Sequence, residues 1–264
     1  MAFAHFQVIG PLPGVYHISD CMGVCMTLLV GTERALLVDT GYGLEDVSAM
    51  VRSLTDKPVT VILTHGHHDH MLGACWFDHA AMFEEDLPDW ETYSSRETKA
   101  NIVKQAEDKG LTVRADFMDT AFPQPLPLRE ERVDLGGLHA EIIRCPGHTP
   151  GSAVVYVPER ELLLTGDDWN PCTWLFFARA LDLRSYRSNM RQLFARLPFR
   201  YVLCSHQHRL YSREMPERFL AALTDEKLAT ACPVPLSKDD RIRPVRCDLT
   251  EDQYIVFDWN KYER

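Results

Sequence analysis

His65-Gly66-His67-His68-Asp69-His70 is the stretch that decides how the rest of this chain is interpreted. It carries histidine and aspartate in the pattern His-x-His-x-Asp-His. In a regular strand, His65, His67 and Asp69 would face one side of the sheet while His70 faced the other. Such a cluster therefore needs a loop, and neutral imidazoles and carboxylates are suitable zinc ligands. The stretch predicts a metal site whose ligands divide between two neighbouring ions.

Three more residues of ligand type stand in a similar context further along the chain. The run 59–64 before the histidine stretch is a continuous apolar strand, as expected where both faces of a strand are covered. Apolar runs also precede His148, Asp167 and His206. If the ends of these strands share one edge of the sheets, ligands from distant parts of the chain converge there.

The remaining periodicity predicts short strands first, then helices alternating with hairpins. This order favours two mixed sheets with helices outside. We expect strands at 14–18, 26–30, 35–41, 201–204 and 254–257, hairpins over 132–143 (turning at 136–137) and 154–165, and helices over 44–54, 91–109, 185–197 and 216–228.

Composition indicates one ordinary globular domain. The chain has 264 residues, of which 45% are hydrophobic and 25% charged. No linker or repeat divides it, so we expect a single domain over 1–264. Residues 76–130 change character and are interpreted as an insertion, either a lid over the site or a solvated segment. The eight cysteines are scattered without a C-x-x-C pair, so free thiols are expected.

Charge and hydropathy narrow the partners. The net charge of -10 disfavours nucleic acid, because gripping phosphates needs a basic face. No apolar run approaches the ~18 residues of a membrane span, and the N-terminus lacks a secretory signal pattern. We expect a cytoplasmic, soluble protein with a small-molecule substrate and no membrane. The sequence predicts no particular oligomeric state, although exposed aromatic residues near the site would permit a dimer.

The motif order resembles the metallo-β-lactamase fold superfamily, in which an H-x-H-x-D-H loop is followed by a His, a bridging Asp and a last His. The resemblance covers about Val15 to His206 and includes Asp39 in Val-Asp-Thr-Gly. It implies an α/β fold, a four-layer αββα sandwich of two mixed β-sheets. By this resemblance Asp39 is structural support, one metal is held by His65, His67 and His148, the second by Asp69, His70 and His206, and Asp167 bridges them.

The residue at the bridging position narrows the branch of the family. True zinc β-lactamases place Cys or Ser where this chain has Asp167. An aspartate there resembles the glyoxalase II, lactonase and phosphodiesterase branches. The implied cofactors are two divalent metal ions, foremost Zn²⁺, although Fe or Mn also suit His and Asp ligands.

The resemblance implies a hydrolase. A water shared by two Lewis-acid ions becomes a hydroxide near neutral pH and attacks a carbonyl or phosphoryl centre. Asp69 is the expected catalytic residue, because it would orient this nucleophile. The expected substrate bond is an ester, thioester, lactone or phosphodiester. Three alternatives stay open: a mononuclear-iron enzyme of the persulfide dioxygenase type, a β-lactam hydrolase, and a non-catalytic metal-binding or sensor protein.

Two of the expected metal ligands have a nearby residue of the same type that could take their place. Asp168 competes with Asp167, but the family's Gly-Asp order favours Asp167 and leaves Asp168 as a supporting residue or helix cap. His208 competes with His206, which follows the strand more closely. His68 is expected to point outward.

The aromatic residues after the ligand loops are either core or pocket. Trp174 and Phe177 are the candidates for a substrate pocket. Trp169, Phe176 and Tyr211 are expected in the core, because aromatic side chains dominate burial.

Overall fold

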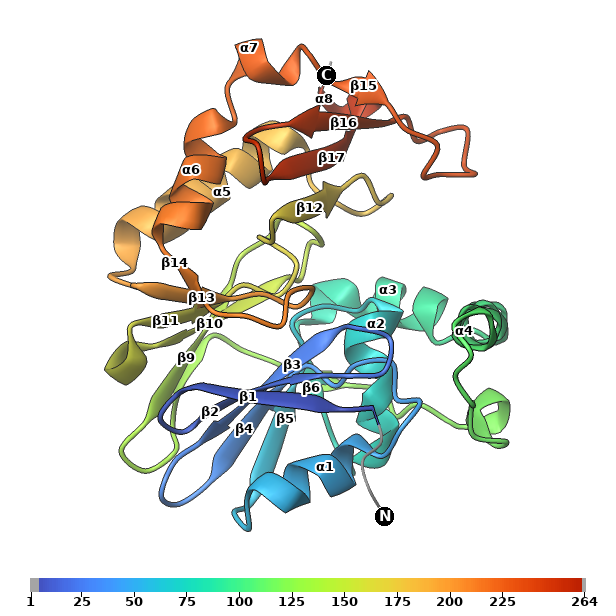
Figure 1. Cartoon of the computed structure of the whole chain (residues 1–264), viewed down its shortest axis with the longest axis vertical. Coiled ribbons are helices and arrows are strands. Elements are labelled where there is room, and N and C mark those ends of the chain that lie inside the picture. The colour runs from blue at the N-terminus through green and yellow to red at the C-terminus, as the bar shows by residue number, and fades with distance from the viewer. Residues whose placement is uncertain (1–4, 263–264) are drawn as a thin grey trace.

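The computed structural model describes residues 5–262, which form three β-sheets with helices around them (Figure 1). The first sheet has seven strands in the order in which they occur in the chain. Its first four strands pair antiparallel and the last three continue parallel. The strands are β1 (Gln7–Leu12), β2 (Val15–Ser19), β3 (Cys25–Val30), β4 (Ala35–Val38), β5 (Val59–Ile62), β6 (Ala81–Met82) and β7 (Leu126–Pro127).

The second sheet has six strands in the order β14-β13-β11-β10-β9-β8. Both predicted hairpins are present in it, as the pairs β8–β9 and β10–β11. The strands are β8 (Glu131–Asp134), β9 (His139–Arg144), β10 (Ala153–Val157), β11 (Leu162–Leu164), β13 (Tyr201–Leu203) and β14 (Tyr211–Ser212).

A third, four-stranded sheet was not expected from the sequence. Its order is β12-β17-β16-β15. β12 pairs in parallel with β17, so residues about eighty positions apart lie side by side. Hydrophobic periodicity reveals a strand but not its distant partner, and this is why the two-sheet expectation was incomplete. The strands are β12 (Cys172–Leu175), β15 (Cys232–Pro233), β16 (Pro244–Asp248) and β17 (Tyr254–Asp258).

Helices cover the outer faces of the sheets (Figure 1). Side-chain caps start several of them: the carboxylate of Asp46 accepts from the backbone of Ala49, and Asp182 does the same for Ser185. The α-helices are α1 (Val47–Leu54), α2 (His68–Met71), α3 (Leu87–Tyr93), α4 (Arg96–Asp108), α5 (Leu183–Arg196), α6 (Glu214–Ala222), α7 (Asp225–Leu228) and α8 (Trp259–Tyr262). The 3-10 turns are Leu72–Trp76, Glu84–Asp86, Phe117–Asp119 and Pro158–Arg160.

The single helix expected over 216–228 is wrong, because the chain breaks between α6 and α7. Leu223 leaves the helical conformation, and the Thr224 hydroxyl caps α7 by accepting from the backbone of Lys227. A threonine that bonds to nearby backbone starts a new helix more readily than it continues one.

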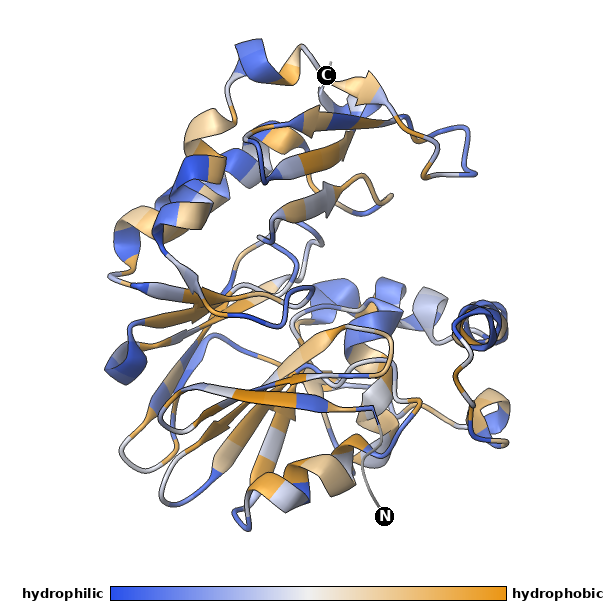
Figure 2. Ribbon diagram, in the orientation of Figure 1, coloured by the Kyte–Doolittle hydropathy of each residue, from blue (hydrophilic) through white to orange (hydrophobic). Residues whose placement is uncertain are grey.

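Strand residues alternate between two cores, as the period-2 pattern requires. On β4, Leu36 and Val38 pack between the two large sheets, whereas Leu37 packs under the helices of the first sheet. On β10, Val155 faces the second sheet's inner side and Val154 faces α5. Figure 2 shows the resulting arrangement, with hydrophobic strands inside and hydrophilic residues on α4 and α7. The layers are helix, sheet, sheet and helix, which is the expected α/β sandwich.

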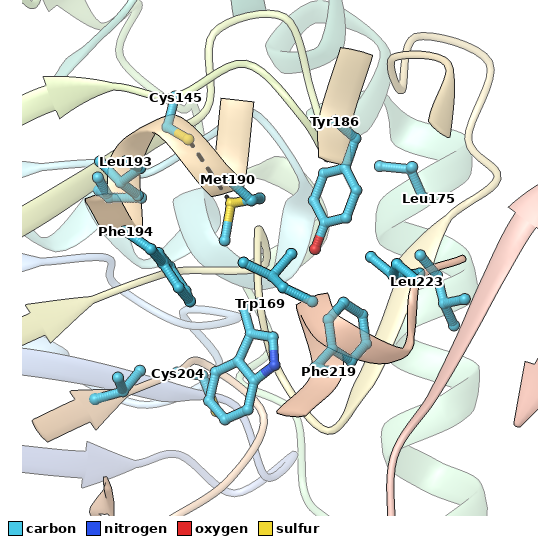
Figure 3. Close-up of a cluster of buried hydrophobic side chains, with 14 of the residues drawn as sticks. Cys145, Trp169, Leu175, Tyr186, Met190, Leu193, Phe194, Cys204, Phe219 and Leu223 are labelled. Atoms are coloured by element: carbon cyan, nitrogen blue, oxygen red, sulfur yellow. Dashed lines mark hydrogen bonds between the residues drawn. The ribbon is translucent and has the colours of Figure 1, made fainter. Parts of the chain in front are cut away.

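The core beneath α5 also anchors a loop that carries a predicted ligand (Figure 3). Trp169 and Tyr186 are completely buried there. The Tyr186 hydroxyl donates to the backbone carbonyl of Asp168 at 2.6 Å, and the Thr165 hydroxyl donates to that of Trp169 at 2.8 Å. The loop after β11 is therefore held from below by the hydrophobic core.

Among the described residues, no helix has both the length and the apolar character needed to cross a bilayer.

Candidate metal centre

Four loops carry the predicted ligands, and each follows the end of a strand. They come after β5, β9, β11 and β13. β11 and β13 are parallel, and β9 runs in the same direction as β11 because both pair antiparallel with β10. The ends of these strands consequently meet at one edge of the sandwich. The sequence expectation that distant ligands converge is met by this geometry.

The structure brings seven residues together, which we call the ligand cluster. Its ligand atoms form overlapping sets, each lying within 4.8 Å: His65 with His67 and His148, His65 with His70 and Asp167, and Asp69 with His70 and His206. The ligand cluster is His65, His67, Asp69, His70, His148, Asp167 and His206.

Asp167 lies between the two histidine groups. Its Oδ2 is 3.0 Å from Nε2 of His206, 3.5 Å from Nε2 of His70 and 3.7 Å from Nε2 of His148. On the other side, Nε2 of His148 is 2.9 Å from Nδ1 of His67. This is the position that a bridging carboxylate requires.

Unpartnered buried atoms show that the ligand cluster fits metal ions. Nε2 of His65, Nε2 of His70 and Oδ1 of Asp167 are buried and have no hydrogen-bond partner. Leaving such a polar atom unpaired costs about 1–3 kcal/mol, so buried polar groups are nearly always satisfied. Two divalent cations that share Asp167, one on the side of His65 and one on the side of His70, would satisfy all three atoms, and imidazole with carboxylate is a donor set that binds zinc, iron or manganese.

Hydrogen bonds hold three imidazoles in the orientation that a ligand needs. Nδ1 of His148 donates to the backbone carbonyl of Trp174 at 2.6 Å. Nδ1 of His70 lies 3.0 Å from a carboxylate oxygen of Asp39, and Nδ1 of His65 lies 3.0 Å from the hydroxyl of Thr64. Each contact leaves Nε2 free to point into the cluster, as ligating histidines commonly do.

Electrostatics separate the ligand cluster into two ends. Burial, reinforced by neighbouring histidines, lowers the pKa of His65 and of His67, and burial also lowers the pKa of His148. These three imidazoles are neutral, which is the form that binds metal.

The carboxylates dominate the other end. Burial alone would raise the pKa of Asp69 and of Asp167, but the adjacent histidines hold both pKa values well below the usual range. Burial would likewise lower the pKa of His70, yet the neighbouring aspartates raise it. Two ionised carboxylates in a buried site attract positive charge.

Asp39 supports the ligand cluster from behind. Its carboxylate accepts from the backbone N–H of Thr64 at 2.7 Å and from the hydroxyl of Thr64 at 2.9 Å, and it contacts His70. Its φ of 65° is left-handed, a conformation that Asp and Asn tolerate better than most residues. Asp39 therefore connects the end of β4 with the histidine loop.

The structure separates each rival pair. Asp168 lies below the cluster, where its Oδ1 accepts from the backbone N–H of His148 at 2.9 Å, and burial raises its pKa well above the ordinary value. No helix starts there, so the helix-cap alternative is wrong. His208 instead contacts the backbone carbonyl of His17 at 3.0 Å, away from the ligand cluster.

The expectation that His68 points outward is wrong. His68 starts the short helix α2. The centroid of its ring lies 5.4 Å from that of the Tyr42 ring and 5.5 Å from that of the Tyr93 ring. Packing by α3 of the 76–130 segment, which the local sequence does not reveal, turns His68 into a residue that lines the cavity over the ligand cluster.

Sequence reasoning missed Asp86, which is fully buried and joins two ligand loops. It accepts from the Thr149 hydroxyl at 2.6 Å, from the N–H of Gly151 at 2.7 Å and from the N–H of Gly66 at 3.3 Å. A Cβ at Gly151 would approach the Asp86 carboxyl to 2.7 Å, so glycine is needed for this close contact. Asp86 follows Glu84 and Glu85 in the chain, and such an acidic run gives no local sign that one of its carboxylates is buried.

A cavity of about 480 Å³ opens over the ligand cluster. Trp174 and Phe177 line it, and Trp174 is 39% exposed, whereas Trp169, Phe176 and Tyr211 are buried in the core. Larger hollows of about 640, 510 and 490 Å³ lie elsewhere on the surface but contain no residue of the ligand cluster. We therefore take the smaller cavity as the candidate substrate site.

Part of the 76–130 segment reaches this cavity. Tyr93 of α3 and Gln105 of α4 line it, and the Tyr93 ring lies 4.7 Å from that of His67. Both ends of the segment are strands, β6 and β7, of the first sheet. Its function as a lid stays a prediction.

Comparison with known proteins identifies the family. The model of the metallo-beta-lactamase superfamily matches residues 20–206. The chain is 27% identical over 175 residues to the acyl-coenzyme A thioesterase MBLAC2 of Bos taurus, covering 59% of this chain and 62% of that protein. It is 28% identical over 148 residues to the hydroxyacylglutathione hydrolase GloC of Haemophilus influenzae, covering 54% of this chain and 65% of that protein.

The fold is also found among solved structures. A metallo-beta-lactamase family protein of Thermus thermophilus, TTHA1429, superposes with a TM-score of 0.58 at 23% identity, over 80% of each chain. The chain therefore belongs to the metallo-beta-lactamase superfamily. It matches less than two thirds of the length of the two curated relatives.

Proposed function

We propose that this protein is a hydrolase that uses two divalent metal ions, foremost zinc, to cleave an ester, thioester, lactone or phosphodiester bond. The observation that carries the proposal is the set of buried ligand atoms without hydrogen-bond partners beneath an open cavity. A buried polar atom without a partner costs free energy, and a bound cation would remove that cost.

The residues have distinct tasks in this proposal. His65, His67 and His148 would hold one ion, Asp69, His70 and His206 the other, and Asp167 both. When bound, the ions would supply Lewis acidity that polarises the substrate and activates a water near neutral pH.

Asp69 would orient the attacking water. Its Oδ2 lies 3.5 Å from Nε2 of His70 and 3.7 Å from Nε2 of His206, and the Asp69 side chain lines the cavity. An ionised carboxylate at this position would accept a hydrogen bond from the water and so fix its orientation toward the substrate.

The relatives favour acyl chemistry. The two curated relatives are named an acyl-coenzyme A thioesterase and a hydroxyacylglutathione hydrolase. These names support hydrolysis of an acyl compound as the first reaction to test.

Metal content per chain tests the proposal, measured by elemental analysis on wild type, His148→Ala and the surface control His139→Ala. We expect about two zinc ions in wild type and in the control, and fewer in His148→Ala with at least a ~100-fold loss of hydrolysis. One iron per chain with oxygen consumption would favour the persulfide-dioxygenase alternative. Bound metal with hydrolysis of β-lactams alone would favour the β-lactamase alternative, and bound metal without any activity a sensor. Absence of metal even after reconstitution would refute the proposal.

A further inference from the structure

The cavity over the ligand cluster has an aromatic side, which we call the aromatic wall: Tyr93, Trp174, Phe177 and Tyr254. The Phe177 ring lies 4.7 Å from that of His67 and 5.1 Å from that of His148. Trp174 is fixed because its backbone carbonyl accepts from His148, while its ring stays 39% exposed. An exposed tryptophan ring held beside a candidate reaction centre provides apolar surface for a ligand.

The same cavity offers no cationic side chain. Among the residues that line it in the described part of the chain there is neither lysine nor arginine. Its polar groups are the exposed parts of the ligand cluster with His68, Gln105, Asn170 and a few hydroxyl and thiol groups.

Cations that adjoin the cavity are bonded to other protein groups: Lys109 donates to the backbone carbonyl of Met22 at 3.2 Å, and Lys261 donates to that of Phe177 at 3.0 Å. Arg179 donates to the carboxylate of Asp89 at 2.8 Å. Arg246 lies 3.8 Å from the outer face of the Tyr254 ring and pairs with Asp248 at 2.7 Å. An anionic substituent in the cavity would lose hydration without gaining a charged partner from the protein.

We infer that the cavity selects substrates that carry an uncharged, apolar substituent beside the bond to be cleaved. This inference rests on the proposed function and narrows it to neutral carboxylic esters, thioesters or lactones. A phosphodiester is anionic, and only the bound metal ions would offset its charge, because neither lysine nor arginine lines this cavity. The apolar substituent lies against Trp174 and Phe177, next to His67 and His148.

Binding of two small thiols to the zinc-loaded protein tests the inference by calorimetry. Phenylmethanethiol carries a neutral aromatic group, and 3-mercaptopropionate carries a carboxylate. We expect wild type to bind phenylmethanethiol at least about tenfold more tightly, since the aromatic wall removes the apolar ring of this thiol from water. Equal or tighter binding of 3-mercaptopropionate would overturn the inference.

Two variants assign the preference to named residues. Trp174→Ala should lose most of the tenfold preference, whereas Trp174→Phe should keep it. Gln105→Lys places a cation in the cavity and should strengthen binding of 3-mercaptopropionate about fivefold or more. Gln192→Lys adds the same charge on the exposed face of α5, outside the cavity, and should change neither affinity. Equal effects of the two lysine variants would count against the inference, because the charge would then act without being in the cavity.

Hydrolysis of matched p-nitrophenyl esters completes the test. One ester carries a butyryl group and the other a succinyl group with a free carboxylate, and each rate is divided by the rate in buffer. Faster cleavage of the butyryl ester supports the inference, and faster cleavage of the succinyl ester contradicts it. Loss of the proposed function would look different: tighter binding of phenylmethanethiol with no hydrolysis of any ester, thioester, lactone or phosphodiester supports the cavity preference and refutes the hydrolase.

Discussion

The ligand cluster and the aromatic wall border the same cavity but differ in the polarity of their side chains and in the elements that carry them. The ligand cluster is polar and comes from four loops, each directly after a strand. The aromatic wall comes from α3, from the region around β12 and from β17, and β17 lies beyond the residues 20–206 that the family model matches. In our proposal, the chemistry and the selectivity of this protein therefore depend on different secondary-structure elements. Substitutions should therefore change one without the other.

The largest expected effect on one region alone comes from substituting Asp39. This residue contacts His70 of the ligand cluster and does not line the cavity. Asp39→Asn keeps a residue that tolerates the positive φ but removes the charge that faces His70. We expect zinc affinity to fall about 10–100-fold, as for other residues that orient a ligating histidine. Competition with a chelator measures this affinity.

The matched control is Asp56→Ala, because Asp56 is exposed on the surface and pairs with Lys57. Its zinc affinity should equal that of wild type. If Asp39→Asn binds zinc as tightly as this control, Asp39 does not orient His70.

Substitution of Asp86 tests how the segment that carries Tyr93 of the aromatic wall is held to the loops of the ligand cluster. Its carboxylate lies on the 76–130 segment and accepts from Gly66 and Gly151 of two ligand loops. Asp86→Ala leaves those buried donors unpaired, so the free energy of unfolding should fall by about 1–3 kcal/mol, measured by urea denaturation. Glu84→Ala, an exposed neighbour, is the control. Equal stabilities would mean that the segment is not held to the ligand loops through Asp86.

The smallest expected effect concerns pH and the scaffold behind the ligand cluster. His17 is buried against Thr27 and the backbone carbonyl of Gln207, and burial lowers its pKa from 6.5 to about 4. As pH falls, His17 is protonated near pH 6.5 in the unfolded chain but only near pH 4 in the folded chain. The contribution of neutral His17 to the free energy of unfolding is therefore fully present above pH 6.5 and is lost as pH falls from 6.5 to about 4.

Between pH 7.5 and 5.5 the metal-free wild type should lose about 1.4 kcal/mol more than His17→Gln. Urea denaturation of both proteins at the two pH values measures the difference. Identical losses in the two proteins would show that the pH sensitivity arises from other groups.

Local pattern was enough for the strands that precede the ligand loops and for the loops themselves. The run before His65 and those before His148, Asp167 and His206 form strands as predicted, because strand propensity and apolar periodicity act within a few residues. A ligand placed just after a strand has its position fixed by that strand. The seven residues of the ligand cluster were accordingly chosen from sequence, and the structure brings all seven together. Their roles as metal ligands stay a proposal.

Tertiary structure alone decided what covers the ligand cluster. The third sheet joins β12 to β17, Asp86 reaches two loops that precede and follow it by many residues, and α3 turns His68 toward the cavity. The same packing placed Trp169 in the core and left Trp174 exposed in the cavity. The amino-acid sequence by itself determined the strands that end at the ligand loops and the residues that these loops carry. It did not determine which distant segments pair, because the energy of such pairing comes from contacts that no short stretch of sequence contains.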